Sequence, residues 1–281
     1  MNKNCDIAFL ILNFNSNDEL KKCIKSIKQY AVDYNYKIVV VDNGSSRENV
    51  EELKKLSRNN IEFILIINGE NLGFARGNNV GFRFIREHIP CKFIAMINSD
   101  VQLIEEGLLD KLENAYSRYN FAVLGPDILN KHNNPMENKL NTKGKVLLEI
   151  RKMRFERAVI KLPVINLCFL AYKRIGYKMT ESRKSVNQVK ENCLLHGSFL
   201  VFSEKYNMES LCPDTFLYGE EAVLAKECAD NGLKMLYYPY IKILHNESGS
   251  TKRAVPQRIK RKIYYYDNYI DSLNVLVKKF Q

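Results

Sequence analysis

The feature that most constrains the fold is a unit repeated over residues 7–100, in which a short apolar run is followed by a helical pattern. The apolar runs occupy residues 7–13, which end in the polar Asn13, residues 37–41, in which four apolar residues follow Lys37, and residues 63–67 and 93–97. Uninterrupted apolar runs of this length are typical of strands that are buried on both faces of a parallel sheet. The alternation therefore predicts an α/β fold, with a mostly parallel sheet flanked by helices.

Two capping boxes predict where the first two helices begin. Residues 16–19 are Ser-Asn-Asp-Glu, and residues 45–48 are Ser-Ser-Arg-Glu. In this spacing a serine and a glutamate each bond a backbone N–H group that the first helical turn leaves free. We expect Ser16 and Ser45 to be the N-caps.

The cysteines and the N-terminus bear on the compartment. The seven cysteines are scattered without a Cys-x-x-Cys pair, so neither a zinc site nor a disulfide framework is indicated. Residues 1–6 are polar and lack the regions of a secretory signal. The longest later apolar run, residues 162–172, is about half of the ~20 residues that span a bilayer. We expect a cytoplasmic protein without a membrane span.

The net charge of +11 is concentrated in two segments. Residues 139–178 hold eleven Lys or Arg against two Glu, and residues 252–281 hold eight against two Asp. Such basic segments with aromatic residues suit anionic lipid headgroups, so a peripheral position at the inner membrane face is one expectation and a solvated basic surface is its equal alternative. We expect no nucleic-acid partner, because the chain contains no recognised nucleic-acid module.

Polar residues follow the predicted strands. Ligands of doubly wound sheets bind at the carboxyl ends of the strands, which here hold Asn13, Asp42, Asn71 and Asp100. Asp42 suits hydrogen bonds from a nucleobase or ribose, but on its own it is better explained as a cap of its Asp-Asn-Gly turn. Asp100 suits Mg²⁺ or Mn²⁺, with nucleotide phosphates as further ligands; the alternative is an N-cap for a helix near Glu105.

The C-terminal half supplies three more candidates. Glu220 and Glu221 precede a predicted helix, where one of them suits a general base toward an acceptor hydroxyl, although the helix dipole alone also favours acids there. His245 ends a predicted strand and suits a metal site, a phosphate contact or an ordinary surface hydrogen bond. The glycines of residues 73–81 match neither the dinucleotide fingerprint nor the Walker loop, which disfavours both sites.

Seven motifs occur in a fixed order along the chain. They are Asn13-Phe-Asn15-Ser, Val41-Asp-Asn-Gly-Ser45, Asn71-Leu-Gly-Phe-Ala-Arg-Gly-Asn78, Asn98-Ser-Asp100, Gly197-Ser-Phe, Phe216-Leu-Tyr-Gly-Glu-Glu221 and His245. In this order they resemble the family 2 glycosyltransferases, especially the rhamnosyltransferase-like branch, over residues 6–266. The resemblance implies a GT-A fold and an inverting single displacement. It also implies transfer from a UDP- or dTDP-sugar, with rhamnose one candidate, to a hydroxyl of a glycan or lipid-linked acceptor in cell-surface polysaccharide synthesis.

The resemblance also implies domains and roles. Residues 1–128 are expected to be the nucleotide-sugar-binding half, residues 129–192 a variable basic insertion, residues 193–250 the acceptor-binding and catalytic half, and residues 251–281 a basic, aromatic helical tail. Nucleotide-sugar binding is implied for Asn13, Asn15, Asp42, Asn43, Asn71, Gly73, Asn78, Asn98 and Ser99. Asp100 is expected to hold Mg²⁺ or Mn²⁺ with His245 beside it, and Glu221 is expected to be the base with Glu220 adjacent.

Three positions depart from the family pattern. Asn98 replaces the first acid of the Asp-x-Asp-like motif, which leaves one carboxylate and weakens metal binding or makes it depend on the nucleotide. Val223 stands where relatives often carry an Asp, and Asp267 stands in a segment that usually reads Arg-Asn. None of these changes removes the base, so we expect activity.

Two other functions stay open. A sugar-nucleotide nucleotidyltransferase also uses an α/β sheet and a metal-holding acid, but residues 13–17 lack the glycine and the basic residue that its first loop usually carries. A non-catalytic nucleotide-sugar-binding subunit is disfavoured by the intact Asp100, Glu221 and His245. The sequence leaves open the donor sugar, the acceptor, the linkage and the oligomeric state, for which a homodimer is one expectation.

Overall fold

The computed structural model describes residues 5–32, 34–58, 63–129, 138–160, 187–212, 214–246, 255 and 257–280. Its helices are α1 (Asn17–Tyr30), α2 (Arg47–Arg58), α3 (Phe74–His88), α4 (Leu108–Tyr119), α5 (Lys143–Val159), α7 (Glu220–Asp230) and α9 (Arg258–Lys278). Its strands are β1 (Cys5–Asn13), β2 (Tyr36–Asn43), β3 (Phe63–Asn68), β4 (Cys91–Asn98), β5 (Val101–Leu103), β6 (Val123–Ile128), β7 (Lys190–Glu191), β8 (Phe199–Ser203) and β9 (Met235–His245). The apolar run of residues 162–172 lies outside the described residues.

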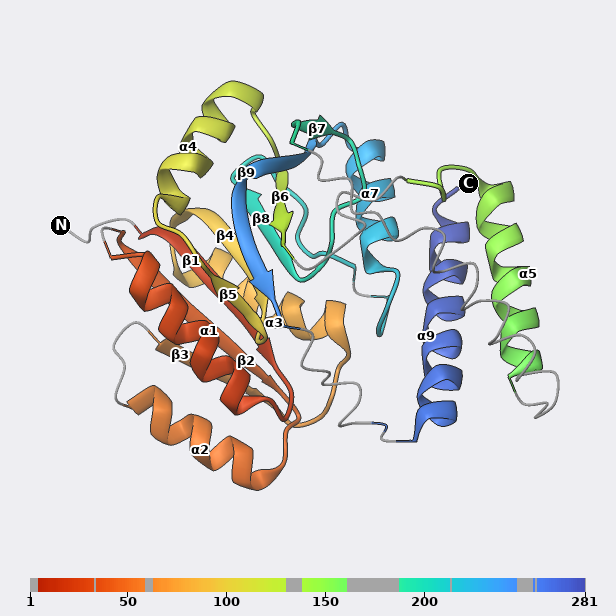
Figure 1. Cartoon of the computed structure of the whole chain (residues 1–281), viewed down its shortest axis with the longest axis horizontal. Helices are drawn as coiled ribbons and strands as arrows, with labels where there is room; N and C mark the ends of the chain where they lie inside the picture. The colour runs from red at the N-terminus through yellow and green to blue at the C-terminus, as the bar shows by residue number, and fades with distance from the viewer. Residues whose placement is uncertain are drawn as a thin grey trace.

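The strands of the described residues form one sheet in the order β3-β2-β1-β4-β8-β6-β9-β5, with β7 beside β9. The first four strands are parallel, which confirms the predicted α/β fold with a mostly parallel sheet. β8 runs antiparallel to both of its neighbours, β4 and β6. Residues on both sides of the expected insertion at 129–192 therefore share one sheet (Figure 1).

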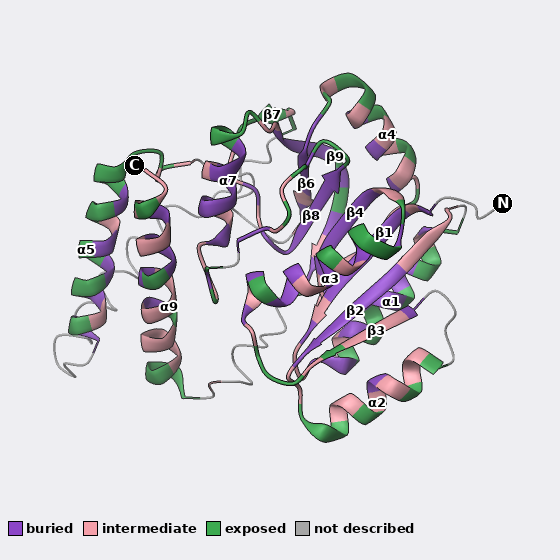
Figure 2. Cartoon of the chain, turned by 180° about the vertical axis from the view of Figure 1, so that it is seen from behind, coloured by how far each residue is buried: buried purple, intermediate pink, exposed green. Residues whose placement is uncertain are grey.

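Helices cover both faces of this sheet. α1, α2 and α4 pack on one face, and α3 and α7 pack on the other (Figure 1). In β1, Phe9 and Ile11 join the first core while Ala8 and Leu10 join the second, and all four are fully buried. Burial on both faces explains why this strand is apolar at successive positions rather than at alternate ones (Figure 2).

The last helix packs between α7 and α5 at one end of the molecule (Figure 1). Ile270 and Leu273 of α9 share a core with Val146 and Ile150 of α5. Glu156 accepts a hydrogen bond of 2.9 Å from the hydroxyl of Tyr266, and the next residue on each helix, Arg157 and Asp267, forms an ion pair that also joins α5 and α9. Among the described residues, none of the helices has both the length and the apolar character that crossing a membrane requires.

The second predicted capping box is wrong by one residue. α2 begins at Arg47, so Ser46 takes the N-cap position, and its Oγ accepts a bond of 3.5 Å from the backbone N–H of Asn49. Ser45 Oγ instead accepts a bond of 2.9 Å from the backbone N–H of Asn15. Ser45 therefore connects the loops that follow β1 and β2, a tertiary contact that local spacing does not reveal.

Candidate active site

The carboxyl ends of β1, β2 and β4 bring the first candidates together. In the parallel ladders Asn13 lies opposite Asp42, and Leu12 lies opposite Asn98. The side chains that end these three strands therefore meet at one edge of the sheet, where ligands of α/β proteins bind.

Asp42 caps its own turn. One carboxylate oxygen accepts a bond of 3.1 Å from the backbone N–H of Ser45, and the other lies 3.5 Å from Nδ2 of Asn13. Asp42 and Asn13 are both 0% exposed, so their side chains support the loops around the site rather than facing solvent. Asn15 is half-buried, and its Oδ1 accepts a bond of 2.9 Å from the backbone N–H of Ser46. The turn-capping explanation of Asp42 fits these contacts.

Asn43 holds the next loop in place. Its Nδ2 donates to Oδ1 of Asn71 at 3.1 Å and to the carbonyl of Gly73 at 2.9 Å. Gly73 has φ +80°, and a Cβ on it would lie 2.3 Å from the carbonyl oxygen of Phe216. Only glycine fits there, because the loop after β3 and the loop before α7 touch through their backbones. Asn78 is buried within α3, and its Nδ2 donates to the carbonyl of Phe74 at 3.0 Å.

Ser16 joins the ends of β1 and β4. α1 begins after Ser16, but its hydroxyl makes no capping bond; it donates to Oδ1 of Asn13 at 2.9 Å and lies 2.9 Å from the hydroxyl of Ser99. The first predicted capping box is therefore right about the position of Ser16 but wrong about its hydrogen bond. The hydroxyl bonds residues at the ends of β1 and β4 instead of a backbone N–H of α1. Ser99 directly precedes Asp100, so this contact connects the first strand end to the next candidate.

Asp100 and His245 are neighbours across the sheet. Nε2 of His245 lies 3.0 Å from Oδ1 of Asp100, and the side chains are 8% and 14% exposed. Strand pairing sets this distance, because Val101 of β5 lies opposite His245 of β9. α4 begins only at Leu108, so Asp100 is not its N-cap.

The Asp100–His245 pair fits part of a divalent metal site. A carboxylate oxygen and an imidazole nitrogen are suitable donors for Mn²⁺ or Mg²⁺. The described residues contain no group of three His, Cys, Asp or Glu side chains placed to hold a metal. A cation held by this pair would need further ligands, such as phosphate oxygens of a nucleotide.

His196 belongs to the same region, and the sequence analysis missed it. Its ring lies 5.6 Å from that of His245, and its Nδ1 accepts a bond of 3.1 Å from the backbone N–H of Ser198. The carbonyl of Ser198 accepts a bond of 2.9 Å from the backbone N–H of Asn98. The available signal was its position directly before the Gly197-Ser-Phe motif.

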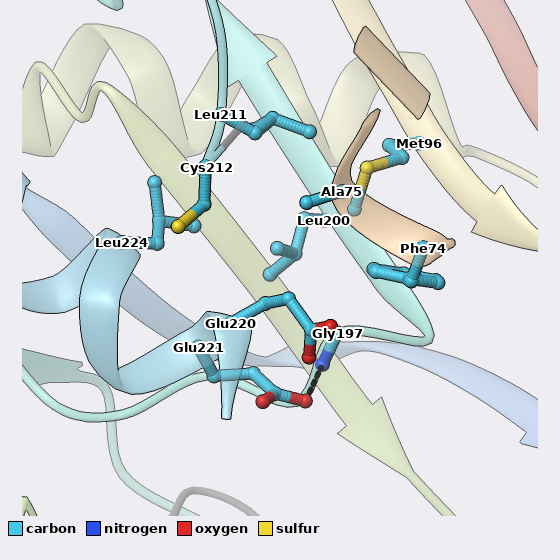
Figure 3. A pocket seen from close by; sticks show the side chains of 10 residues that line it. All are labelled: Phe74, Ala75, Met96, Gly197, Leu200, Leu211, Cys212, Glu220, Glu221 and Leu224. Carbon is cyan, nitrogen blue, oxygen red and sulfur yellow. Dashed lines mark hydrogen bonds between the residues drawn. The ribbon is translucent and has the colours of Figure 1, made fainter. Parts of the chain in front are cut away.

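Glu221 lies against the loop that carries His196. Its Oε1 accepts a bond of 3.3 Å from the backbone N–H of Gly197 (Figure 3). A Cβ on Gly197 would lie 3.0 Å from that oxygen, so the close approach favours glycine. Burial raises the pKa of Glu221, and backbone N–H groups, including that of Gly197, act against this rise. The side chain is half-buried, which leaves it within reach of a ligand.

Glu220 has a different environment from its neighbour. It is 9% exposed, and its Oε1 has no hydrogen-bond partner among the described residues. It lines a cavity of about 20 Å³ with Glu221 and largely apolar side chains, including Met96 and Leu200 (Figure 3). Burial, together with the charge of Glu221, raises the pKa of Glu220 to about 8. Of the two acids, Glu221 has the exposure and the hydrogen-bonded carboxylate that a base requires.

A continuous series of contacts thus connects the strand ends with the acids. It runs from Asp42 through Asn13 and Ser16 to Ser99, and on from Asp100 through His245 and His196 to Gly197 and Glu221. The residues expected to converge on one bound diphosphate lie at one edge of the sheet.

Comparison with known proteins adds a distant relative. The low-salt glycan biosynthesis hexosyltransferase Agl10 of Haloferax volcanii is 27% identical over 146 residues. The alignment covers 52% of this chain and 44% of the relative, so the chain matches less than half the length of that protein.

Solved structures share the fold. The mannosyltransferase PcManGT of Pyrobaculum calidifontis, in complex with GDP-Man and Mn²⁺, aligns with a TM-score of 0.52 and 12% identity over 99% of this chain and 74% of that one. TarS of S. aureus in complex with UDP aligns with a TM-score of 0.52 and 12% identity over 98% and 70%. These likenesses show the GT-A fold.

The model of one family, "Glycosyl transferase family 2", matches residues 9–179 of the chain. The match covers more than half of the sequence and includes the strand ends from Asn13 to Asp100. The chain therefore belongs to glycosyl transferase family 2.

Proposed function

We propose that this chain transfers a hexosyl group from a nucleoside-diphosphate sugar to an acceptor hydroxyl with inversion at the anomeric carbon. The observation that carries the proposal is the contact series that brings Asp100, His245 and Glu221 to one edge of the sheet. The family and the hexosyltransferase relative support the same reaction class. UDP- and dTDP-sugars are the expected donors, with dTDP-rhamnose tested first, and a glycan or lipid-linked glycan is the acceptor.

Glu221 is the general base of this proposal. Its carboxylate takes the proton from the acceptor hydroxyl as that oxygen bonds to the anomeric carbon and the bond to the nucleoside diphosphate breaks. The N–H of Gly197 holds the carboxylate in position during this transfer. Because the acceptor oxygen displaces the nucleoside diphosphate in a single step, the configuration at the anomeric carbon is inverted.

Asp100 and His245 would hold a divalent cation in this reaction. When bound, Mn²⁺ or Mg²⁺ supplies electrostatic stabilisation of the leaving diphosphate. His196 faces the same region from the loop before β8, where an imidazole suits contact with phosphate oxygens.

Nucleotide binding and base catalysis are tested separately. A panel of UDP-, dTDP- and GDP-sugars is screened for thermal stabilisation with and without Mn²⁺. The best donor is then used to compare wild type with Glu221→Gln, which keeps the side-chain shape but cannot accept the proton. We expect unchanged donor binding and a fall in transfer of about 10²–10⁴-fold.

Asp230→Asn is the matched control, because this acid lies on the same helix α7 and is exposed beside Lys226. Wild-type transfer by Glu221→Gln would refute its role as base. The anomeric configuration of the product, read by NMR, tests inversion. Failure of every nucleotide sugar to bind would refute the function itself.

The outer face of α5 supports a peripheral membrane position. This face exposes Leu147, Leu148 and Phe155, interspersed and flanked by the exposed basic residues Lys143, Lys145, Arg151, Lys152 and Arg154 (Figure 2). Phe155 and Leu148 are each 65% exposed on a helix whose other side packs on α9. Exposed apolar side chains among cations suit an anionic lipid surface, which would bring a lipid-linked acceptor to the site.

Co-sedimentation with vesicles tests this surface. We expect binding to phosphatidylglycerol-containing vesicles and much weaker binding to phosphatidylcholine alone. The double variant Leu148→Glu, Phe155→Glu should abolish it, whereas Val32→Glu, a change at a residue that is 73% exposed outside α5, should not. Failure of the wild type to bind anionic vesicles would refute the membrane proposal and leave the sugar transfer untouched.

A further inference from the structure

Three tyrosine rings pack against one another beside the proposed base. The rings of Tyr218 and Tyr265 meet edge to face with centroids 4.9 Å apart. The rings of Tyr265 and Tyr269 stack at 5.7 Å with an interplanar angle of 19°. Tyr218 comes from the loop before α7, and the other two come from α9, so the cluster is a tertiary arrangement.

The cluster packs against the start of α7, the helix that carries Glu221. Tyr218 lies three positions before Glu221 in the chain. A Cβ on the intervening Gly219 would lie 3.2 Å from the ring of Tyr269, so that ring packs against the start of α7. Burial raises the pKa of Tyr265 to about 12, and the charge of Glu221 is among the further causes, as it is for Tyr269.

Core packing does not account for every ring in this segment. Tyr266 is the packing residue, since it is 7% exposed and donates to buried Glu156. Tyr265 is 38% exposed and belongs to none of the buried clusters of the described residues. Large aromatic surface left open beside the proposed general base indicates a ligand contact.

The backbone at Tyr218 is strained. Its φ is +67°, in the left-handed region that non-glycine residues rarely adopt. Gly219, the N-cap of α7, also has a positive φ, at +84°. This conformation costs a glycine little free energy, because glycine has no Cβ. Strain of this kind persists where the surroundings impose it and gathers at functional sites. In this protein the strained residue is Tyr218, whose ring packs against that of Tyr265.

We propose that Tyr218 and Tyr265 form an acceptor subsite, in which a sugar ring of the acceptor glycan stacks against the aromatic faces and presents its hydroxyl to Glu221. The inference rests on the proposed transfer reaction. An acceptor hydroxyl must lie within hydrogen-bond reach of the base, so the partly exposed surface beside Glu221 contacts the acceptor. Tyrosine suits this ligand because its ring covers the C–H face of a sugar and its hydroxyl bonds the polar rim.

Binding to immobilised glycans tests the subsite. The probes are mono- and disaccharides that end in hexose, 6-deoxyhexose or N-acetylhexosamine, presented with Mn²⁺ and either UDP or dTDP. Tyr218→Leu and Tyr265→Leu keep an apolar side chain but remove the flat ring, and Tyr265→Phe keeps the ring. Tyr240→Leu is the matched control, because Tyr240 is 57% exposed and meets the ring of Tyr238 edge to face at 5.1 Å.

We expect the wild type to retain at least one probe class. Both leucine variants at the subsite should weaken that binding by about tenfold, while Tyr265→Phe stays within about threefold and Tyr240→Leu is unchanged. Nucleotide binding and donor hydrolysis should be the same in all variants. This separates loss of the acceptor from loss of the donor.

Three outcomes would overturn the subsite while leaving the proposed transfer intact. They are wild-type glycan binding by both leucine variants, retention of no probe by a protein that binds nucleotide, and loss of binding that merely follows thermal unfolding of both variants. The last outcome would assign the rings to packing of α9 on α7. Absence of nucleotide binding in the wild type would instead refute the transfer function, and the subsite with it.

Discussion

Nε2 of His245 lies 3.0 Å from Oδ1 of Asp100, although 145 positions separate the two residues in the chain. The pairing of β5 with β9 places them side by side at the edge where β1, β2 and β4 end. Their proximity turns two residues with ordinary local explanations into one pair of candidate metal ligands.

Replacing the histidine tests that pair. His245→Ala should raise the Mn²⁺ concentration needed for half-maximal stabilisation of the nucleotide complex by about tenfold or more, because one of two protein donors is lost. The measurement is thermal unfolding in the presence of donor nucleotide and increasing Mn²⁺. Asn246→Ala, at the exposed next residue, is the control. An unchanged Mn²⁺ requirement in His245→Ala would exclude His245 as a ligand.

Gly197→Ala tests whether the contact with Gly197 positions the proposed base, Glu221. The new methyl group would lie 3.0 Å from Oε1 of Glu221, so the carboxylate or the loop must shift. Since a misplacement of about 1 Å can cost roughly 100-fold in rate, we expect kcat to fall by about that factor while donor affinity is kept. Gly144→Ala, where the added Cβ meets nothing within 4 Å, should retain full activity. Equal kcat values for the two variants would show that the Gly197 contact does not position the base.

The pH dependence of stability should report Glu220. Burial and the charge of Glu221 raise the pKa of Glu220 to about 8, so the folded state keeps a proton that the unfolded chain releases near its ordinary value of 4.5. The contribution of Glu220 to the free energy of unfolding is therefore fully present below about pH 4.5 and is lost as the pH rises toward about 8. Glu220→Gln should remove this loss, so its advantage in free energy of unfolding over the wild type should grow across that window. Denaturant unfolding at pH 5, 6.5 and 8 measures the difference, and a constant difference would contradict the burial of an uncharged Glu220.

Ser16→Ala should destabilise the fold more than loss of an ordinary cap. It removes the hydroxyl that bonds Asn13 and contacts Ser99, both buried, with an expected cost of roughly 1–3 kcal/mol. Ser46→Ala removes an exposed N-cap contact of α2 and should cost about 0.5–1 kcal/mol. Urea unfolding of the two variants compares them. A larger loss for Ser46→Ala would mean that the link between the strand ends contributes little.

The local pattern of apolar and polar residues predicted the strands β1 to β4 and the start of helix α7. The apolar runs at 7–13, 37–41, 63–67 and 93–97 lie within β1 to β4, because strands inside the sheet are covered on both faces. At the edge of the sheet β3 is less covered, and its Ile67 is 44% exposed. The acids at 220 and 221 do begin a helix, α7. Secondary-structure propensity and hydrophobic periodicity depend on a few neighbouring residues, so they predict features that extend over the same short range.

The bonding of single side chains could not be predicted in the same way. The hydroxyls of Ser16 and Ser45 were expected to cap helices, and both serve contacts between loops instead. His196 was not predicted, although it directly precedes the Gly197-Ser-Phe motif, because its significance comes from its contact with His245 on another strand. Whether a local bond is formed depends on which distant partner competes for the same group.

The sequence alone determined the α/β class and the polar residues at the strand ends, because both follow from which residues must be buried and where each buried run stops. Only the tertiary structure decided that β8 enters the sheet antiparallel between β4 and β6, that Asp100 meets His245, and that Glu220 and Glu221 differ in environment. Those facts depend on pairing and packing between distant segments, which give two adjacent, chemically identical acids different hydrogen bonds: Glu221 accepts one from Gly197, and Oε1 of Glu220 has no partner among the described residues.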